Sequence, residues 1–225
     1  MKIIPAIDIV NGHCVRLSQG DYERQTTYFD DPLDAAERFW LGGYRQLHLV
    51  DLDGAKEAKP VNLDVLKRIA GKFPDMKVEW GGGLKSAEAI RQVFDAGATW
   101  AICGSVAAVQ PEMFEAWIDE FGAERMVLGA DARDGKIATH GWLKASEWTI
   151  ETLIGRFPKL RRAIVTDISR DGMLCGVDVE FYRRLQDRFP QVEITVSGGI
   201  ASLDEIPKLE AAELRSAVVG KAFYV

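Results

Sequence analysis

The sequence predicts an α/β fold, a (βα)8 TIM barrel built from two pseudo-symmetric half-barrels. Three observations predict it: apolar, β-branched runs alternate with amphipathic stretches, the predicted strands number eight, and a glycine-rich motif recurs half a chain later. Strands that alternate with helices favour parallel βαβ units. The length of 225 residues suits one domain, because α/β barrels run past 200 residues as single domains. We therefore expect one barrel domain over residues 1–225, with half-barrels of about 1–122 and 123–225.

Eight short apolar runs are predicted to be the strands. They are rich in valine and isoleucine, which favour strands, and glycine, aspartate or serine follows several of them. The predicted strands cover residues 2–8, 46–51, 77–80, 99–103, 126–131, 162–167, 192–197 and 216–220.

Amphipathic stretches between these strands predict seven helices. Residues 31–43 have a proline near the start and glycines at the end, as helix boundaries prefer. Pro207 is expected to kink or shorten the last helix. Residues 9–31 are expected to form a long loop that closes over a substrate, because loops of that length are usually functional. Further helices are predicted over residues 86–97, 111–122, 178–190 and 202–212.

Composition narrows the class of function. The net charge is −6 and the pI about 5.2, which disfavours a nucleic-acid binder, since such proteins usually need a basic face. The chain has three cysteines and no C-x-x-C spacing, so neither a disulfide framework nor a zinc site is indicated. There is no signal peptide and no apolar run of 18 residues. We therefore expect a cytoplasmic protein.

An internal repeat favours the barrel over a doubly wound sheet, which is the competing fold. Gly82 and Gly83 align with Gly198 and Gly199 at an offset of 116 residues, and the same offset relates the later glycines of "ICGS" and "VVGK". Two similar halves that face each other close a barrel with a pseudo-two-fold axis. A doubly wound sheet gives no reason for this symmetry.

Two aspartates stand at corresponding strand ends. Asp8 ends the first strand and Asp131 ends the fifth, 123 residues later. Strand interiors disfavour aspartate, whereas barrels present their chemistry at the carboxyl ends of their strands. These two carboxylates are therefore candidate catalytic groups. The alternative for Asp8 is a solvated strand end or a helix cap.

Two glycine turns are candidate phosphate sites. Glycines let backbone N–H groups approach an anion closely, and a helix N-terminus adds partial positive charge. The alternative is a tight connection between strand and helix. Two such sites related by the repeat imply a ligand with a phosphate at each end, whose middle faces the two aspartates. The candidate residues are Gly81, Gly82, Gly83, Gly104, Ser105, Ser197, Gly198, Gly199, Gly220 and Lys221.

Seven segments, in order, resemble those of one family: PAIDIVNGHCVRLSQGDYERQTTY, LHLVDLDGA, GGGLKS, GADARDGKIATHGW, TDISRDGM, SGGI and VVGKAF. Over essentially its whole length the chain resembles the phosphoribosylformimino-5-aminoimidazole carboxamide ribotide isomerases of histidine biosynthesis. The resemblance implies a (βα)8 barrel and an Amadori rearrangement of an aminoaldose to a ribulosyl aminoketose. It implies a bisphosphorylated small-molecule substrate, no cofactor and no metal. We expect no nucleic-acid or membrane partner, and a monomer.

The resemblance also implies catalytic roles. Asp8 is the implied base and Asp131 the implied acid, roles that two carboxylates can divide if their surroundings push their pKa values apart. Thr166 and Asp171 are implied to contact the ribose and to assist proton transfer. The alternative for Asp171 is a turn residue, because "RDG" is a common turn composition.

Three further residues are candidates for substrate binding. Arg16 lies in the expected first loop, and its alternative is a solvated surface arginine. His48 near the end of the second strand is an orienting group or, alternatively, a core histidine. Trp142 could stack on the imidazole carboxamide ring or could simply pack.

Other functions stay open beside this isomerase. The related cyclase has a Cys-Leu-Asp first strand and a lysine in its first loop, where this chain has Ala6-Ile7-Asp8 and Arg16. A bifunctional isomerase would also convert phosphoribosyl anthranilate, and a non-catalytic barrel would only bind phosphosugars. The family pattern continues after the eighth strand with a final helix, and this chain ends at Val225 without it.

Overall fold

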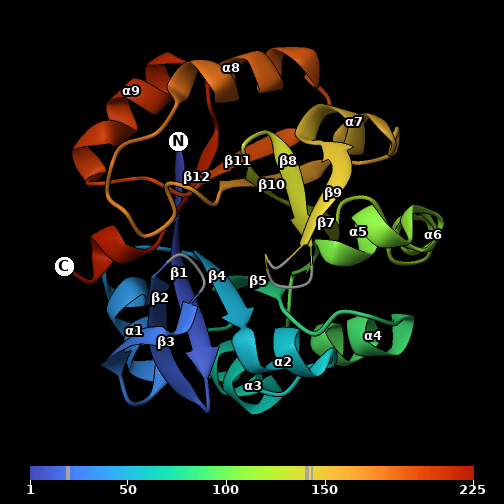
Figure 1. Ribbon diagram of the computed structural model, residues 1–225. Helices are drawn as coiled ribbons and strands as arrows, with labels where there is room; N and C mark the ends of the chain where they lie inside the picture. The colour runs from blue at the N-terminus through green and yellow to red at the C-terminus, as the bar shows by residue number, and fades with distance from the viewer. Residues whose placement is uncertain (19–20, 140–141, 143) are drawn as a thin grey trace. The chain divides into compact units, whose positions relative to one another are not determined.

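The computed structural model describes residues 1–18, 21–139, 142 and 144–225, and Figure 1 labels its elements. The described residues form two compact units. The N-terminal unit comprises residues 4–17 and 21–102, and the C-terminal unit comprises residues 1–3, 18 and 103–225.

The N-terminal unit is built on four parallel strands. They are hydrogen-bonded in the order β1 (Lys2–Val10), β4 (Gln46–Asp51), β5 (Lys77–Gly81) and β6 (Trp100–Cys103). An antiparallel hairpin, β2 (His13–Ser18) and β3 (Asp21–Phe29), follows β1. The helices between the strands are α1 (Pro32–Leu41), α2 (Leu52–Glu57), α3 (Leu63–Lys72) and α4 (Ala87–Asp95).

The C-terminal unit repeats this plan. Its parallel strands are paired in the order β7 (Met126–Arg133), β10 (Arg162–Asp167), β11 (Glu193–Ser197) and β12 (Ser216–Val219). An antiparallel hairpin, β8 (Lys136–Thr139) and β9 (Lys144–Thr149), follows β7. The helical segments are α5 (Ser105–Val109), α6 (Pro111–Phe121), α7 (Ile150–Gly155), α8 (Val179–Arg188), η1 (Leu203–Glu205), α9 (Ile206–Ala211) and η2 (Lys221–Phe223).

The predicted fold class is confirmed. In the described residues eight parallel strands, each followed along the chain by helical structure, make up the (βα)8 class. The predicted strands differ from the observed ones by at most two residues at any end. Pro207 shortens the last helical stretch as expected, because η1 precedes an α9 that begins next to this proline. None of the described helices is both long and apolar enough to cross a bilayer.

The expectation of a loop over residues 9–31 is wrong, because most of this segment forms the hairpin after β1. Asn11 and Gly12 have φ angles of 50° and 76°, and Asp134 and Gly135 have 52° and 76°. Such paired positive values are typical of the tight type I′ turn, which favours Asn-Gly and Asp-Gly. The two turns are 123 residues apart, like Asp8 and Asp131. The internal repeat therefore includes both hairpins.

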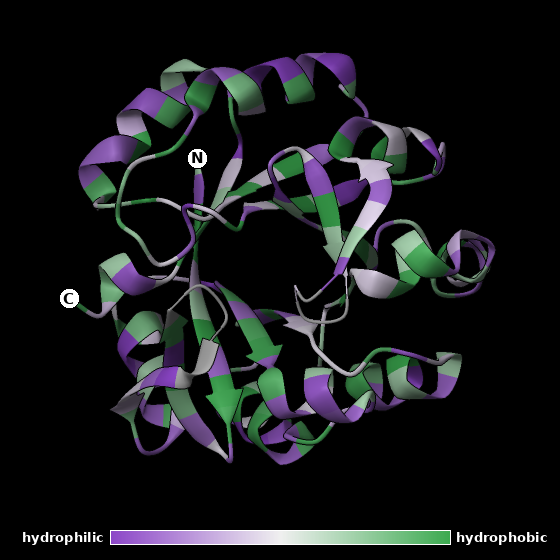
Figure 2. Ribbon diagram, viewed as in Figure 1, coloured by the Kyte–Doolittle hydropathy of each residue, from purple (hydrophilic) through white to green (hydrophobic). Residues whose placement is uncertain are grey.

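Alternation along the strands separates a helix-facing side from a side that carries polar groups. In β4, Leu47 and Leu49 are fully buried, whereas His48 and Val50 between them are partly exposed. The helices bury apolar stripes such as Leu66 and Ile69 of α3. Figure 2 shows hydrophilic and hydrophobic residues interspersed on α8 and α9, as expected for helices with one exposed face.

Glu193 binds two cations at the start of the C-terminal sheet. Its carboxylate oxygens lie 2.7 Å from Lys2 Nζ and 2.8 Å from Arg162 Nη1. Burial by itself would raise the pKa of Glu193, but the hydrogen bond from Lys2 and the charges of Arg162 and Lys2 outweigh it. The pKa of Glu193 therefore lies below its ordinary value.

This lowered pKa predicts a contribution to stability that depends on pH. A carboxyl group with a lowered folded-state pKa stabilises the fold above its unfolded pKa and stops doing so as the pH falls through the folded value. We expect Glu193→Gln to lower the free energy of unfolding by about 1 kcal/mol at neutral pH. The variant should then lose less stability than the wild type between about pH 5 and pH 3. Urea unfolding at several pH values measures this, and parallel stability profiles would contradict it.

Candidate functional site

Four residues form a row across the N-terminal sheet. Asp8 of β1 is in register with Val50 of β4, Val50 with Gly81 of β5, and Gly81 with Ile102 of β6. Residues in register on neighbouring parallel strands project to the same face of a sheet. Asp8 and Gly81, both predicted from sequence, therefore stand on one face and at one level.

The C-terminal sheet carries the equivalent row. Asp131 of β7 is in register with Thr166 of β10, and Thr166 with Ser197 of β11. Val50 and Thr166 are 116 residues apart, as are Gly81 and Ser197, so the register reproduces the repeat seen in the sequence. The structure thus brings together three predicted site residues of this unit.

Asp8 is held by an arginine from the hairpin that follows its strand. Arg16 lies on β2, and its Nη1 donates to Asp8 Oδ2 at 2.7 Å. Its Nη2 also donates to the carbonyl of Ala6 at 3.4 Å. Each side chain of the pair is 15% exposed, so the ion pair is poorly solvated. Arg16 is therefore not the solvated surface arginine that was its alternative.

Asp131 is also bound by a donor from its own hairpin region. Trp142 lies between β8 and β9, and its indole N–H donates to Asp131 Oδ2 at 2.9 Å. Its φ angle is 71°, which is uncommon for a bulky residue, so this tryptophan is held in a strained backbone conformation. Each candidate catalytic carboxylate thus receives a hydrogen bond from the segment that follows its strand.

The glycines of both turns are required by close backbone packing. A Cβ added at Gly82 would lie 2.1 Å from the carbonyl oxygen of Asp51, and one at Gly198 would lie 2.6 Å from that of Asp167. The φ angles of 103° and 86° also favour glycine. The tight connection named as the alternative is therefore present in both halves. It neither requires nor precludes an anion beside it.

Other side chains hold these turns in place. Trp80 donates its indole N–H to the carbonyl of Gly82 at 3.1 Å. In the C-terminal unit, the hydroxyl of Tyr182 lies 2.9 Å from the carbonyls of Val165 and Ser197. Burial raises the pKa of Tyr182 well above its ordinary value, so the phenol stays a neutral donor. Both glycine turns therefore rest on a buried aromatic side chain.

The remaining predicted phosphate ligands follow the last strand of each half. Gly104 precedes α5, which begins at Ser105. Gly220 precedes η2, which begins at Lys221. Lys221 Nζ donates to the carbonyl of Gly172 at 3.0 Å, and Gly83 and Gly199 belong to the two turns described above. These positions agree with the repeat, and no bound anion is present to test them.

Asp171 lies in the turn between β10 and α8. Its backbone N–H donates to the carbonyl of Ile168 at 3.3 Å, so the turn reading of "RDG" holds for the backbone. The neighbouring Asp167 accepts from Ser169 and pairs with Arg170, which makes it a structural residue of this turn.

His48 has a partner that sequence reasoning missed. Its Nδ1 lies 2.8 Å from Oε1 of Glu79, and the Glu79 side chain is 5% exposed. The signal in the sequence was the charged residue inside the apolar run "KVEW", at a position where burial needs a partner. That partner is on another strand, 31 residues away, and only the register brings the two together.

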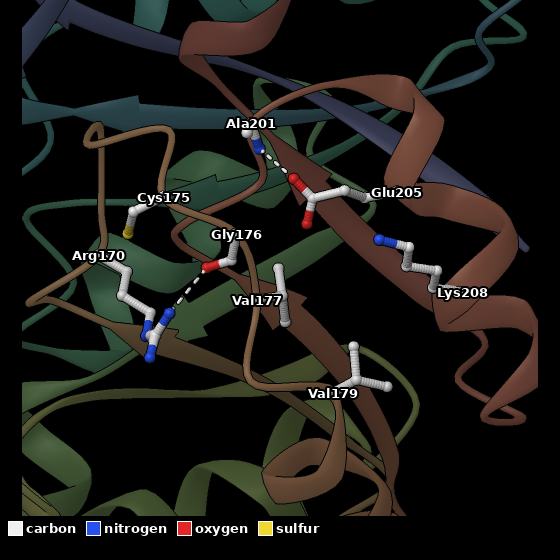
Figure 3. A pocket seen from close by; sticks show the side chains of 8 residues that line it. All are labelled: Arg170, Cys175, Gly176, Val177, Val179, Ala201, Glu205 and Lys208. Atoms are coloured by element: carbon white, nitrogen blue, oxygen red, sulfur yellow. Dashed lines mark hydrogen bonds between the residues drawn. The ribbon is translucent and has the colours of Figure 1, made fainter.

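A pocket of about 400 Å³ lies elsewhere in the C-terminal unit (Figure 3). Two of its residues hold nearby backbone groups: Arg170 donates to the carbonyl of Gly176 at 3.1 Å, and Glu205 accepts from the N–H of Ala201 at 2.9 Å. None of the site residues predicted from sequence lines it, so it is distinct from the two rows. Its lining is Arg170, Cys175, Gly176, Val177, Val179, Ala201, Glu205 and Lys208.

Comparisons with known proteins extend over the whole chain. A family model described as "Histidine biosynthesis protein" matches residues 2–225. Relatives from Parabacteroides distasonis and Flavobacterium johnsoniae are 42% and 43% identical over 226 residues, which cover 100% of this chain and 94% of each relative. A relative from Leuconostoc mesenteroides is 41% identical over 224 residues, 99% of this chain and 94% of its own length. All three are named as isomerases of a phosphoribosylated imidazole-4-carboxamide. The chain belongs to the histidine biosynthesis protein family.

Proposed function

We propose that this chain is the isomerase of histidine biosynthesis that converts a bisphosphorylated aminoaldose to its ribulosyl aminoketose. The names of the relatives describe a compound with two 5-phosphoribosyl groups joined through an imidazole-4-carboxamide. The observation that carries the proposal is the pair of equivalent rows, each of which begins with an aspartate at the end of a strand. Two-fold repetition of a carboxylate and a glycine turn suits a substrate with a phosphate at each end.

The Amadori rearrangement requires two proton movements, and we assign one carboxyl group to each. Asp131, as the acid, protonates the ring oxygen of the aminoaldose, so that the ring opens to a Schiff base. Asp8, as the base, then removes the C2 proton, which gives an enolamine. Protonation at C1 and loss of the proton from the C2 hydroxyl complete the ketose, so the atoms balance without a redox cofactor.

The neighbours of each aspartate fit these roles. The guanidinium of Arg16 at 2.7 Å stabilises the ionised form of Asp8, which a base needs before it accepts a proton. Asp131 lies beside Thr166, whose hydroxyl we place at the ribose to assist proton transfer together with Asp171. Trp142 occupies one oxygen of Asp131, and the other oxygen is the one we assign to the substrate.

We assign the two phosphates of the substrate to the two glycine turns. Gly81, Gly82 and Gly83 with Gly104 and Ser105 would bind one, and Ser197, Gly198 and Gly199 with Gly220 and Lys221 the other. The exposed backbone of glycine supports this, because N–H groups can approach the phosphate oxygens closely. His48 and Trp142 are assigned to the middle of the substrate. We further propose that the chain acts as a monomer in the cytoplasm, away from nucleic acid.

The test is a steady-state assay on two substrates. We expect the wild-type chain to convert the bisphosphorylated aminoaldose and to leave phosphoribosyl anthranilate unchanged. Comparable kcat/KM values on both compounds would show the bifunctional isomerase instead. Binding of the aminoaldose without turnover would overturn the enzyme assignment and leave a phosphosugar-binding barrel.

A further inference from the structure

Glu79 is a buried carboxylate without an assigned role. Its residue is 4% exposed in the sheet of the N-terminal unit. His48 Nδ1 lies 2.8 Å from Oε1, and the amide nitrogen of Gln46 donates to Oε2 at 3.0 Å. A buried charged group is costly unless it is hydrogen-bonded, and these two contacts occupy both oxygens. The pair is therefore a defined arrangement.

The strand register places this pair one layer below the candidate base. His48 is in register with Ala6 of β1 and with Glu79 of β5. Asp8 comes two residues after Ala6 on the same strand, so it projects to the same face at the next level. The imidazole of His48 therefore lies next to the layer that holds Asp8 and Gly81.

The carboxylate determines which nitrogen of His48 carries a proton. An ionised carboxylate accepts hydrogen bonds and cannot donate them, and here Oε2 already accepts from Gln46. Nδ1 must then carry the proton of the hydrogen bond to Oε1. Nε2 is the ring nitrogen that this contact leaves for a ligand.

The repeat shows that the fold does not require this pair. Residues 116 positions later are Ile164 for His48 and Thr195 for Glu79. In the C-terminal unit Thr195 Oγ1 lies 2.8 Å from Ser216 Oγ, so a neutral hydroxyl pair occupies the equivalent buried place. A barrel layer of this kind is thus stable without a histidine or a carboxylate.

We propose that Glu79 is a positioning residue, which holds His48 with its proton on Nδ1 and so presents Nε2 to the substrate beside Asp8. The proposal rests on the proposed isomerase function, because it assigns the ring to the substrate of that reaction. Glu79 itself does not touch the substrate. Its effect passes through the orientation and tautomer of His48, as in other carboxylate–histidine pairs.

Nuclear magnetic resonance of the histidine ring nitrogens tests this directly. The chain has three histidines, so selective 15N labelling gives few signals, and His48→Asn identifies the one that belongs to His48. We expect the wild type to carry a proton on Nδ1 of His48. In Glu79→Gln the amide NH2 can donate to Nδ1 while its oxygen accepts from Gln46, so the proton should move to Nε2. A proton on Nε2 in the wild type would overturn the proposal, whether or not any variant folds.

Kinetics give the second readout. We expect Glu79→Gln to lower kcat on the aminoaldose on the order of 10-fold, with KM changed less than about 2-fold, because ground-state binding keeps its contacts. Thr195→Val is the matched control, since it removes one partner of the equivalent polar pair and leaves His48 untouched. It should leave the tautomer and kcat unchanged.

The outcomes separate this proposal from the proposed function. Unchanged kcat and tautomer in Glu79→Gln would overturn the positioning role. An equal loss of kcat in Thr195→Val would also overturn it, because the loss would then come from the sheet. An inactive wild type whose His48 carries its proton on Nδ1 would overturn the isomerase assignment, while the geometry assigned to Glu79 would stand.

Discussion

Replacing Asp8 with asparagine is expected to lower kcat on the aminoaldose by about 10²–10⁴-fold. The amide has nearly the size of the carboxylate, and its oxygen can still accept from Arg16 Nη1, which donates to Asp8 at 2.7 Å. It cannot accept the C2 proton. The substrate should still bind, so the loss should fall on kcat rather than on KM. Steady-state kinetics beside a binding measurement checks both parts.

Asp131→Asn is the companion of this experiment. It stands at the equivalent place in the second row and should also lower kcat strongly, because the amide is no acid for the ring oxygen. Thermal unfolding of both variants controls for loss of structure. Full activity in Asp8→Asn would contradict its assignment as the base.

Replacing Gly82 with alanine is expected to destabilise the fold by about 3–5 kcal/mol. The added Cβ would lie 2.1 Å from the carbonyl oxygen of Asp51 and 2.8 Å from its carbonyl carbon. Both are backbone atoms of the turn after β4, so neither can rotate away. The φ angle of 103° adds strain for any L side chain. Urea unfolding measures the change in the free energy of unfolding.

Gly43→Ala is the matched control for this change. Gly43 has a φ angle of 88°, and nothing lies within 4 Å of an added Cβ. It should therefore lose only the strain of the backbone conformation, about 1–2 kcal/mol. Equal losses in the two variants would show that close approach to Asp51 is not the reason for glycine at position 82.

Much of the fold is predictable from the sequence because buried parallel strands have a strong local signal. Their runs of β-branched residues, such as "RAIVTD", bury both faces, and the glycine or aspartate that follows marks each end. The repeat added long-range information that a single segment lacks. It aligned the glycine turns, and the observed register agrees with that alignment.

The hairpins were missed because length alone was used to interpret residues 9–31. The polar strand β3 has no buried apolar face in its sequence, so the segment looks like a loop. The dipeptides Asn11-Gly12 and Asp134-Gly135 carried the better signal, since few other residues favour two successive positive φ angles.

The contacts within the site could not be predicted for a different reason. Which donor reaches Asp8 or Asp131 depends on the path of each hairpin, and Glu79 meets His48 only through the register of β4 and β5. Sequence identifies residue types at strand ends. Pairing between distant strands decides which of them touch.

The most direct test of the central claim is to follow the substrate itself by NMR. With the wild-type chain and the bisphosphorylated aminoaldose, we expect the C1 methine of the ribosyl group to be replaced by a methylene beside a C2 ketone. The same sample with Asp8→Asn should keep the aminoaldose spectrum over the same period. A wild-type chain that binds the compound and leaves its C1 methine intact would contradict the account.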